Sequence, residues 1–420
     1  MNQSCSIIIG AGLGDEGKGH YADIFCNKPN TLNIRFNGGP QAAHTVVTPD
    51  GRRHAFRHFG AGTFAGAATY LSSDFLVNPV AFVLEYSELQ EKFGIKPTVF
   101  VNKESPVTTL FDMYINQAVE EYRDKNRHGS CGMGIWETVV RTNDPEYVIR
   151  VKDLYFKRTL KEKLKKIMDV YVPKRLKEEY HLELSDLDTL SEEYPEMLSS
   201  DETISMFMFY VDIFLTQVTI RDNTIINCFK NIVLEGAQGL GLDENNPSCN
   251  PDFLTPSTTG VTNAMKILSF ASFTCIPDIY YISRAYATRH GVGPLEHEKE
   301  STSYKNAIDM TNKTNKFQGD FRFAYIDFDV LSKRIEEDIK KITIPSKINI
   351  GFTCLDQLDD SVGIGFNDGI ARIQSRSFIS EAKKYFEDKL SNLSGMSITY
   401  GLTRDDFEII WDLCTKTPAE

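Results

Sequence analysis

Short apolar runs separated by glycine-bearing turns dominate the first part of the chain. They lie at residues 6–9, 31–36, 69–71 and 98–101, and each has the length and β-branched or aromatic content of a buried strand. A helix-like patch at 80–91 falls between two of these runs. Buried strands that alternate with helical segments predict a mostly parallel sheet flanked by helices.

The pattern changes between residues 151 and 222. Leu160, Leu164 and Ile167 recur at helical spacing among lysines, and the run 204–218 is apolar on several faces. We therefore expect a mainly helical insertion at about 151–222.

Strand signals return after this insertion, at residues 231–234, 279–282, 347–350 and 397–400, and an amphipathic helix is expected at 380–390. The chain has no internal repeat and no low-complexity segment. The expected fold class is α/β, with residues 1–420 forming a single domain around a large, mostly parallel central sheet.

Composition narrows the classes of function. The content of 41% hydrophobic and 25% charged residues is ordinary for a globular protein with a large core. No apolar run approaches the roughly 20 residues that span a membrane. The N-terminal segment also lacks a basic region followed by an apolar region, the pattern that would predict a secretory signal. Eight cysteines without a CxxC pair predict free thiols in a reducing cytoplasm. A net charge of −12 argues against nucleic-acid or anionic-membrane partners, and leaves small anionic ligands open.

The first buried run leads directly into the segment GAGLGDEGKGH at residues 10–20. A strand, a glycine-rich turn and a lysine together present backbone N–H groups and one cation to a phosphate. The common triphosphate loop carries a hydroxyl after its lysine, whereas here Gly19 follows Lys18. Asp15 and Glu16 would repel phosphate unless a metal or a proton transfer requires them. The segment predicts a phosphate site with chemistry built into it, although a glycine-rich turn with solvated charges would look similar.

Further small-residue segments could bring a ligand close to the backbone. NGGPQAAHT at 37–45 and EGAQG at 235–239 each follow or end a strand-like run, so both are expected at the carboxyl edge of a parallel sheet. TPSTTG at 255–260 groups hydroxyls, and YATRHGVGP at 286–294 carries one fixed cation. Taken singly, each segment would also fit a structural turn.

Taken together, these motifs resemble the adenylosuccinate synthetase family in order and spacing over roughly residues 5–300, with weaker matches beyond. Enzymes of that family phosphorylate O6 of a 6-oxopurine nucleotide, typically IMP, with GTP, and aspartate then displaces the phosphate from C6. The resemblance implies the same α/β fold and a C–N ligase. It also implies a purine nucleoside monophosphate, a nucleoside triphosphate and L-aspartate as partners, and a cytoplasmic homodimer.

The resemblance also implies roles for individual residues. Asp15 would take the N1 proton of the purine and hold Mg²⁺, whose second protein ligand would be the carbonyl of Ala43. His44 would be the general acid at the transferred phosphoryl group, and Lys18 would neutralise its charge. Gln238 would orient the base through its O6/N1 edge.

Other positions are implied as binding residues. Gln41 stands where the family has an asparagine, and Arg141 falls where an arginine is supplied across the dimer interface. The nucleotide- and phosphate-binding set is Gly14, Glu16, Gly17, Gly19, Gln41, Ser130, Cys131, Arg141, Thr255, Asp356 and Gly401. The aspartate-binding set is Arg322, Gln318 and Arg289.

Two stretches depart from the family pattern. The arginine-rich aspartate loop is reduced to Arg322, with Gln318 at a threonine position and Asp320 where an arginine normally reaches the ribose 2′-hydroxyl region. The guanine-recognition motif TKLD occurs as TCLD, with Cys354 in place of the lysine. The identity of the amine donor and the choice among GTP, ATP and dATP therefore stay open.

Three alternatives remain for the function. The altered loops point towards a (d)GMP-specific, phage-type 2-amino-adenylosuccinate synthetase, but that branch typically has a smaller residue where this chain keeps Asp15. We therefore expect IMP or dIMP. A non-catalytic nucleotide-sensing paralogue would not need Asp15, Lys18, His44 and Gln238 together. A simple ATPase or GTPase is disfavoured by the missing hydroxyl after Lys18.

Overall fold

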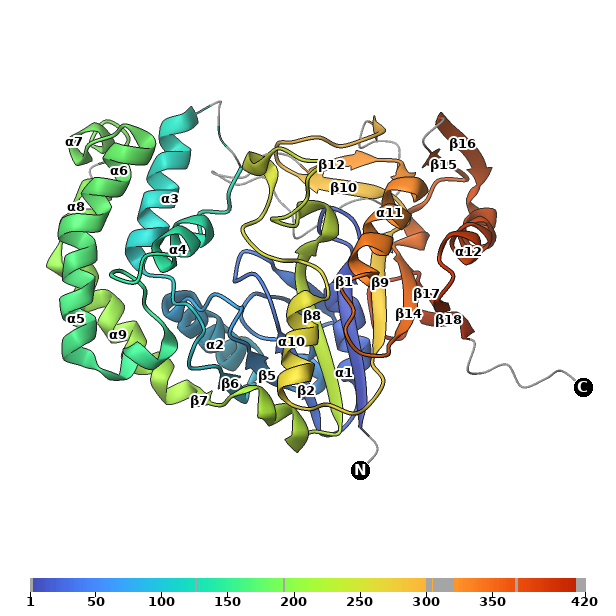
Figure 1. The fold of residues 1–420 in the computed structure, drawn as a ribbon, viewed down its shortest axis with the longest axis horizontal. Helices are drawn as coiled ribbons and strands as arrows, with labels where there is room; N and C mark the ends of the chain where they lie inside the picture. The colour runs from blue at the N-terminus through green and yellow to red at the C-terminus, as the bar shows by residue number, and fades with distance from the viewer. Residues whose placement is uncertain are drawn as a thin grey trace, which may run out of the picture.

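The computed structural model describes residues 3–124, 127, 129–191, 193–299, 304, 321–366 and 369–412. Its centre is a ten-stranded sheet in the order β18-β17-β14-β9-β1-β8-β2-β5-β6-β7 (Figure 1). Neighbouring strands are parallel, except that β18 runs antiparallel to β17. The strands are β1 (Ser4–Gly10), β2 (Thr31–Arg35), β5 (Ala68–Leu71), β6 (Val99–Val101), β7 (Thr219–Ile220), β8 (Asn231–Gly239), β9 (Asp278–Arg284), β14 (Lys347–Thr353), β17 (Leu393–Thr399) and β18 (Phe407–Asp412). The predicted fold class is confirmed.

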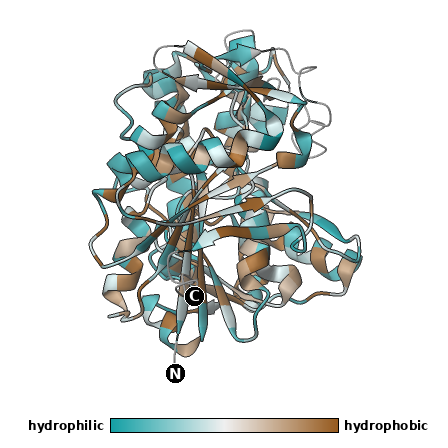
Figure 2. Ribbon diagram, turned by 90° about the vertical axis from the view of Figure 1, so that its right-hand side faces the viewer, coloured by the Kyte–Doolittle hydropathy of each residue, from teal (hydrophilic) through white to brown (hydrophobic). Residues whose placement is uncertain are grey.

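Hydrophobic clusters cover both faces of this sheet, as buried parallel sheets require. Side chains alternate along β1, so Ile8 joins one cluster, whereas Ile7 and Ile9 join the other. The first cluster includes helices α1 (Lys18–Cys26) and α2 (Pro79–Phe93), and the second includes α10 (Thr262–Phe270), α11 (Phe328–Ile339) and α12 (Phe378–Lys389). Hydropathy colouring shows the apolar residues concentrated in the central strands (Figure 2).

A helical region separates β6 from β7 in the chain and lies on one side of the molecule (Figure 1). Its helices begin upstream of residue 151, because α3 already has the capping box of Thr109 and Asp112 and an amphipathic pattern. The elements are α3 (Leu110–Arg123), α4 (Ile135–Thr142), η3 (Val151–Tyr155), α5 (Lys157–Lys166), the π-helical η4 (Ile167–Tyr171), α6 (Val172–Tyr180), α7 (Leu184–Leu187), α8 (Glu193–Ser199) and α9 (Asp201–Gln217).

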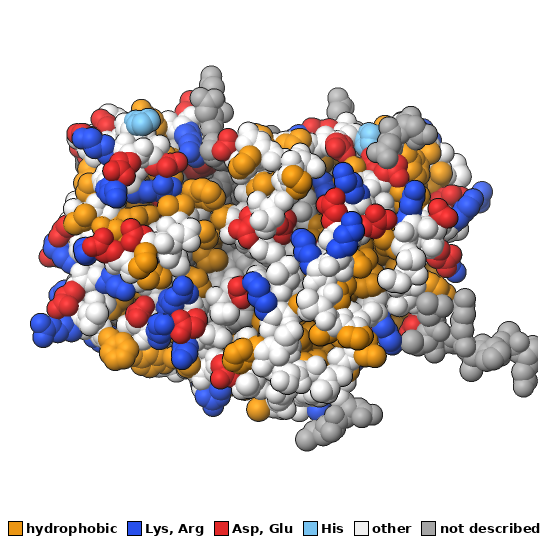
Figure 3. Space-filling view, viewed as in Figure 1, with side chains coloured by type: hydrophobic (Ala, Val, Ile, Leu, Met, Phe, Trp, Pro, Cys, Tyr) orange, Lys and Arg blue, Asp and Glu red, His pale blue; other side chains and the backbone are white. Residues whose placement is uncertain are grey.

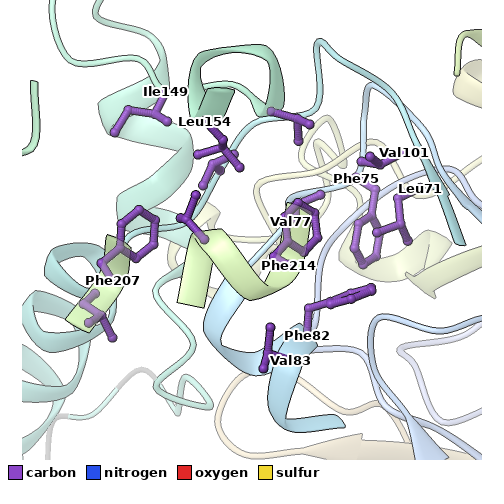
Figure 4. Close-up of a cluster of buried hydrophobic side chains, with 14 of the residues drawn as sticks. Leu71, Phe75, Val77, Phe82, Val83, Val101, Ile149, Leu154, Phe207 and Phe214 are labelled. Carbon is purple, nitrogen blue, oxygen red and sulfur yellow. The ribbon is translucent and has the colours of Figure 1, made fainter. Parts of the chain in front are cut away.

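The hydrophobic core is continuous from the sheet into the helical region. Phe207 and Phe214 of α9 belong to the same buried cluster as Leu71 of β5, Phe82 of α2 and Val101 of β6 (Figure 4). Phe82 and Phe214 meet edge to face, with ring centroids 4.9 Å apart. The helices are therefore attached to the sheet through shared apolar packing.

Smaller sheets flank the carboxyl edge of the central one. They are the hairpin of β3 (His44–Val47) and β4 (Arg53–Phe56); the trio β10 (Ala287–His290), β12 (Phe321–Ala324) and β11 (Glu298–Lys299); and the trio β13 (Ile326–Asp327), β15 (Ser361–Phe366) and β16 (Gly369–Gln374). None of the described helices has the length and apolar character needed to cross a bilayer. The cysteines of the described ranges are free thiols, as predicted.

Candidate active site

A cavity of about 890 Å³ opens at the carboxyl edge of the central sheet. One wall is formed by the segments that follow β1, β8, β9 and β14, together with the hairpin of β3 and β4. The opposite wall comes from α3, α4 and the segment between them. This is the place where parallel α/β sheets bind their ligands, because strand ends and helix N-termini meet there.

The loop after β1 is braced from inside by Glu16. This side chain is 2% exposed, and its carboxylate accepts hydrogen bonds from the Gly14 backbone N–H at 2.7 Å and from Lys18 Nζ at 2.5 Å. A Cβ atom on Gly10 or Gly239 would overlap the same carboxylate, so glycine is required at both positions. Glu16, the second carboxylate of the motif, thus serves mainly as the counter-charge for Lys18 at the cavity wall.

Asp15 lies in this loop with a left-handed backbone, φ +59°, which is uncommon for a residue with a side chain. Its carbonyl oxygen accepts a hydrogen bond from Arg284 Nε at 2.5 Å, and the next carbonyl, that of Glu16, accepts one from Thr353 Oγ1 at 2.9 Å. Helix α1 then begins at Lys18, and no side chain in the described part of the chain caps its N-terminus. Its first N–H groups can therefore meet an anion in the cavity.

His44 faces the loop from the start of β3. Its Nδ1 donates a short hydrogen bond to one carboxylate oxygen of Glu235, whose other oxygen accepts the Ala61 backbone N–H at 3.0 Å. Burial lowers the pKa of His44 to about 4, and the neighbouring Glu235 carboxylate only partly opposes this effect. Gly19 permits the approach, since a Cβ there would lie 2.8 Å from His44 Cβ. The imidazole is thus neutral at pH 7, with Nε2 left for a ligand.

Two glutamine side chains in the cavity wall have unpaired amide atoms. Oε1 of Gln238, and both Oε1 and Nε2 of Gln41, are buried without a hydrogen-bond partner among the described residues. Gln238 also has a left-handed backbone, φ +60°. An unpaired buried amide group costs about 1–3 kcal/mol. Both amides therefore fit positions that bind a polar ligand.

Most of the residues expected from the sequence line this one cavity. Ser130 is held there by Asn116, whose Nδ2 donates to its Oγ at 2.9 Å, and the Ser130 backbone N–H donates to Glu120 at 3.2 Å. The predicted residues in the lining are Gly14, Asp15, Glu16, Gly17, Lys18, Gly19, Gln41, Ala43, His44, Ser130, Cys131, Gln238, Thr255, Arg289 and Gly401.

Arg141 does not have the position that the family resemblance led us to expect. Its guanidinium forms two 2.8 Å hydrogen bonds with Asp112 and donates at 2.7 Å to the carbonyls of Tyr147 and Val107. The side chain is fully buried, so it joins α4 to the core and cannot reach across a dimer interface. The homodimer remains a prediction that rests on the family resemblance.

Asp356 and Arg322 also lie outside the cavity lining. Asp356 is exposed in η9 (Leu355–Gln357), whereas Cys354 and Gln357 of the same turn line the cavity. Arg322 pairs with Glu298 at 2.5 and 2.7 Å and donates to the carbonyls of the 291–293 loop. It therefore supports the loop that follows β10, the strand that contains Arg289, its cross-strand partner. Gln318 is outside the described residues.

Several lining residues were not predicted from the sequence. Arg284, the last residue of β9, holds the Asp15 carbonyl, and its position at a parallel strand end was the signal that could have identified it. Glu235, the first residue of the motif EGAQG, is buried behind the lining and orients His44. Arg53 and Arg57 also line the cavity; no sequence pattern marked either one.

The donor set suits Mg²⁺ shared with phosphate. The described residues contain no group of three or more His, Cys, Asp or Glu side chains able to hold a metal. Asp15, which has a carboxylate, and Ala43, which has a main-chain carbonyl, both line this cavity. Mg²⁺ typically binds through one or two such protein oxygens together with water and substrate phosphates, so these residues fit the ion.

Comparisons with known proteins identify the same family that the sequence motifs resemble. The model of the adenylosuccinate synthetase family matches residues 7–335. The adenylosuccinate synthetase of Thermoplasma volcanium is 25% identical over 360 residues, which cover 83% of this chain and 77% of that protein. The Microcystis aeruginosa enzyme is 28% identical over 298 residues, covering 70% and 62%.

Two solved structures share the fold. Fully ligated adenylosuccinate synthetase from Plasmodium falciparum has a TM-score of 0.70 and 18% identity, covering 97% of this chain and 100% of that one. Cyanophage S-2L succinoaminodeoxyadenylate synthetase, bound to dGMP and to dATP as an energy donor, has a TM-score of 0.61 and 11% identity, covering 99% and 97%.

Proposed function

This chain belongs to the adenylosuccinate synthetase family of C–N ligases, and from that premise we propose that it joins L-aspartate to C6 of IMP or dIMP with hydrolysis of a nucleoside triphosphate. The observation that carries the proposal is the convergence of Asp15, Lys18, His44 and Gln238 on one cavity. These side chains come from the segment after β1, from β3 and from the end of β8. Together they supply the base, the cation, the acid and the amide that the reaction needs.

The first step makes a purine oxygen nucleophilic. The unpaired amide of Gln238 would bind the O6/N1 edge of the base, and the Asp15 carboxylate would accept the N1 proton. The electron pair released at N1 moves to O6, which attacks the γ-phosphorus of the triphosphate. The products of this step are a 6-phosphoryl purine nucleotide and a nucleoside diphosphate.

Positive groups would stabilise the transferred phosphoryl group. Lys18 and the N-terminus of α1, both at the cavity, would face the phosphate oxygens. Bound Mg²⁺, held by the Asp15 carboxylate and the Ala43 carbonyl, would supply further positive charge. His44 would donate from Nε2; a phosphate anion beside it would raise its low pKa, because opposite charge favours the protonated ring.

The second step forms the C–N bond. The aspartate amine attacks C6, the C6–O6 bond breaks, the amine loses a proton and inorganic phosphate leaves. Arg289 is our candidate for binding an aspartate carboxylate, because it lines the cavity and donates from all three of its nitrogens to backbone carbonyls that fix its position. Its burial lowers its pKa from the usual value.

A substrate matrix tests this function. IMP, dIMP, GMP and dGMP would each be combined with ATP, dATP or GTP, with Mg²⁺ and aspartate present, and products would be identified by mass. We expect a succinyl-purine nucleotide from IMP or dIMP. Product from GMP or dGMP alone would identify the 2-amino alternative. Nucleotide binding without any aspartate-dependent product would contradict the ligase and support a sensing paralogue.

A further inference from the structure

The backbone of the catalytic loop is held by side chains from two neighbouring strand ends. Arg284, at the end of β9, donates to the carbonyl of Asp15, and Thr353, at the end of β14, donates to the carbonyl of Glu16. The strands β9 and β14 pair in parallel, with Arg284 opposite Thr353. The left-handed conformation of Asp15 is thus supported from a single place in the sheet.

Arg284 also continues into a chain of hydrogen bonds that leads away from the loop. Its Nη1 donates to the hydroxyl of Tyr286 at 2.8 Å, and that hydroxyl donates to Oε1 of Gln357 at 2.5 Å. The guanidinium carbon lies 5.5 Å from the Tyr286 ring centroid. Tyr286 is 1% exposed and stacks on Tyr304, with centroids 4.4 Å apart. The chain of contacts is therefore internal and geometrically constrained.

The far end of this chain reaches the ligand cavity. Gln357 lines the cavity together with Cys354, Thr399 and Leu402. This is the sector that the family resemblance assigns to the base of the triphosphate. Because Oε1 of Gln357 accepts the hydrogen bond of the Tyr286 hydroxyl, the Nε2 amino group is the part of this amide that can donate to a ring nitrogen or carbonyl of that base.

We propose that Arg284 is a positioning residue for Asp15, and that Tyr286 and Gln357 couple its grip on the loop to the base bound against Gln357. The identity of the reaction rests on the proposed function. The coupling between Gln357 and the Asp15 loop is a property of the protein and can be measured without turnover. A base that accepts a hydrogen bond from Gln357 orders the amide. The ordered amide then fixes Tyr286 and Arg284, and the Asp15 carbonyl stays in its place.

Hydrogen exchange on the intact protein tests the coupling directly. Adenosine and guanosine are the probes, because a nucleoside without phosphates cannot contact the α1 N-terminus through phosphate. In the wild type we expect saturating nucleoside to slow amide exchange at residues 11–17 as well as at 353–357. In Tyr286→Phe, which keeps the ring and removes the hydroxyl, we expect slowing at 353–357 alone. Equal slowing of the loop in both proteins, or none in the wild type, would overturn the proposal.

A matched control is available elsewhere in the chain. Tyr325 accepts a hydrogen bond from Arg372 at 3.1 Å, and that guanidinium carbon lies 5.7 Å from the Tyr325 ring. Tyr325→Phe therefore removes a similar contact from an arginine–tyrosine pair outside the cavity lining. It should leave the nucleoside effect on residues 11–17 unchanged; loss of the effect in this control would contradict a specific coupling.

Kinetics provide the second readout. If the residues act in series, Tyr286→Phe and Gln357→Ala should each lower kcat about tenfold, and the double variant should be no worse than either single one. Arg284→Lys, which can reach one acceptor but not two, should show a similar loss. KM for aspartate should stay within about twofold, because none of the three residues is assigned to that substrate.

Additive losses, or wild-type kcat in the single variants, would overturn the coupling. Absence of product in the wild type would sink the proposed function, while the exchange experiment would still decide the coupling.

Discussion

Asp15 combines a strained backbone with the central chemical role in the proposed reaction. A non-glycine residue at φ +59° costs free energy, and aspartate and asparagine tolerate this region better than most residues. The hydrogen bond from Arg284 and the neighbouring one from Thr353 hold the backbone in place. Strain at such a position is retained where the surrounding contacts determine it, which is typical of active sites.

Asp15→Asn separates the chemistry from the conformation. Asparagine keeps the size and the tolerance for a left-handed backbone, but its amide cannot accept the N1 proton. We expect turnover to fall by about 10²–10⁴-fold, with the denaturant midpoint essentially unchanged. Steady-state rates and urea unfolding check both parts. Normal turnover in this variant would exclude Asp15 as the base.

The second prediction at the residue scale concerns His44 and pH. Its pKa is about 4 in the folded protein and near 6.5 in an unfolded chain, so the unfolded state binds more protons between these values. The free energy of unfolding should therefore fall as pH is lowered from 6.5 towards 4, by at most about 1.4 kcal/mol per pH unit from this group. Denaturant unfolding at pH 7 and pH 5 should show a smaller loss in His44→Gln than in the wild type. Equal losses of stability in the two proteins would mean that another group takes up the proton on unfolding, for example His58, whose pKa is also lowered by burial.

At the scale of elements, β8 and the loop after β1 meet without space for side chains. Gly239 approaches both the Glu16 carboxylate and the Gly12 carbonyl so closely that a Cβ would overlap them. Backbone cannot move aside as a flexible side chain can. The close approach keeps Glu16 against Lys18 and thereby sets the direction of α1 into the cavity.

Gly239→Ala should disturb this junction. Overpacking of this kind typically costs about 1–3 kcal/mol, and triphosphate binding should weaken because the loop must shift. Urea unfolding and calorimetric titration with triphosphate measure the two effects. Gly51→Ala is the control, since a Cβ there meets nothing within 4 Å and adds only backbone strain at φ +85°. Unaltered binding in Gly239→Ala would contradict the role given to this contact.

Arg141 provides a second prediction at this scale, because it joins α3 to α4 through Asp112. Arg141→Met leaves a buried carboxylate without its partner and should cost about 3–5 kcal/mol of stability. Arg158→Met, at an exposed pair with Glu162, should cost about 0.5 kcal/mol or less. At a temperature where both variants are folded, the kcat of each variant should be near the wild-type value. A selective loss of nucleotide affinity in Arg141→Met would restore the binding role that its burial argues against.

Sequence patterns predicted elements better than they predicted pairings. Each apolar run interpreted as a buried strand, from residues 6–9 to 397–400, became a strand of the central sheet. The two-residue β7 is too short to show a pattern, whereas the antiparallel β18 has four apolar residues among its six and was overlooked. Arg141 and Arg322 lie outside the cavity lining because each pairs with a partner, Asp112 or Glu298, that tertiary packing sets. Arg284 was missed for the same reason: its contact with Asp15 spans 269 positions.

At the scale of the whole molecule, sheet order explains how distant motifs share one cavity. β1 lies between β8 and β9, and β9 pairs with β14, so the segments after these strands meet at one edge. The helical region supplies the opposite wall from α3 and α4. On the face shown in Figure 3, basic and acidic side chains are interspersed. The cavity lining likewise carries both signs of charge, with Arg53, Arg57 and Arg289 alongside Glu120 and Asp252, in a chain of net charge −12.

The central claim is that Asp15 and its neighbours make purine O6 the nucleophile, and an isotope label at O6 tests it most directly. IMP carrying ¹⁸O at C6, or the substrate identified by the matrix, would be incubated with triphosphate, Mg²⁺ and aspartate, and the released phosphate analysed by mass. If O6 is the nucleophile, each phosphate released with a succinyl-purine product should carry one ¹⁸O atom. Phosphate that carries oxygen from water, with the label retained in the nucleotide, would contradict it.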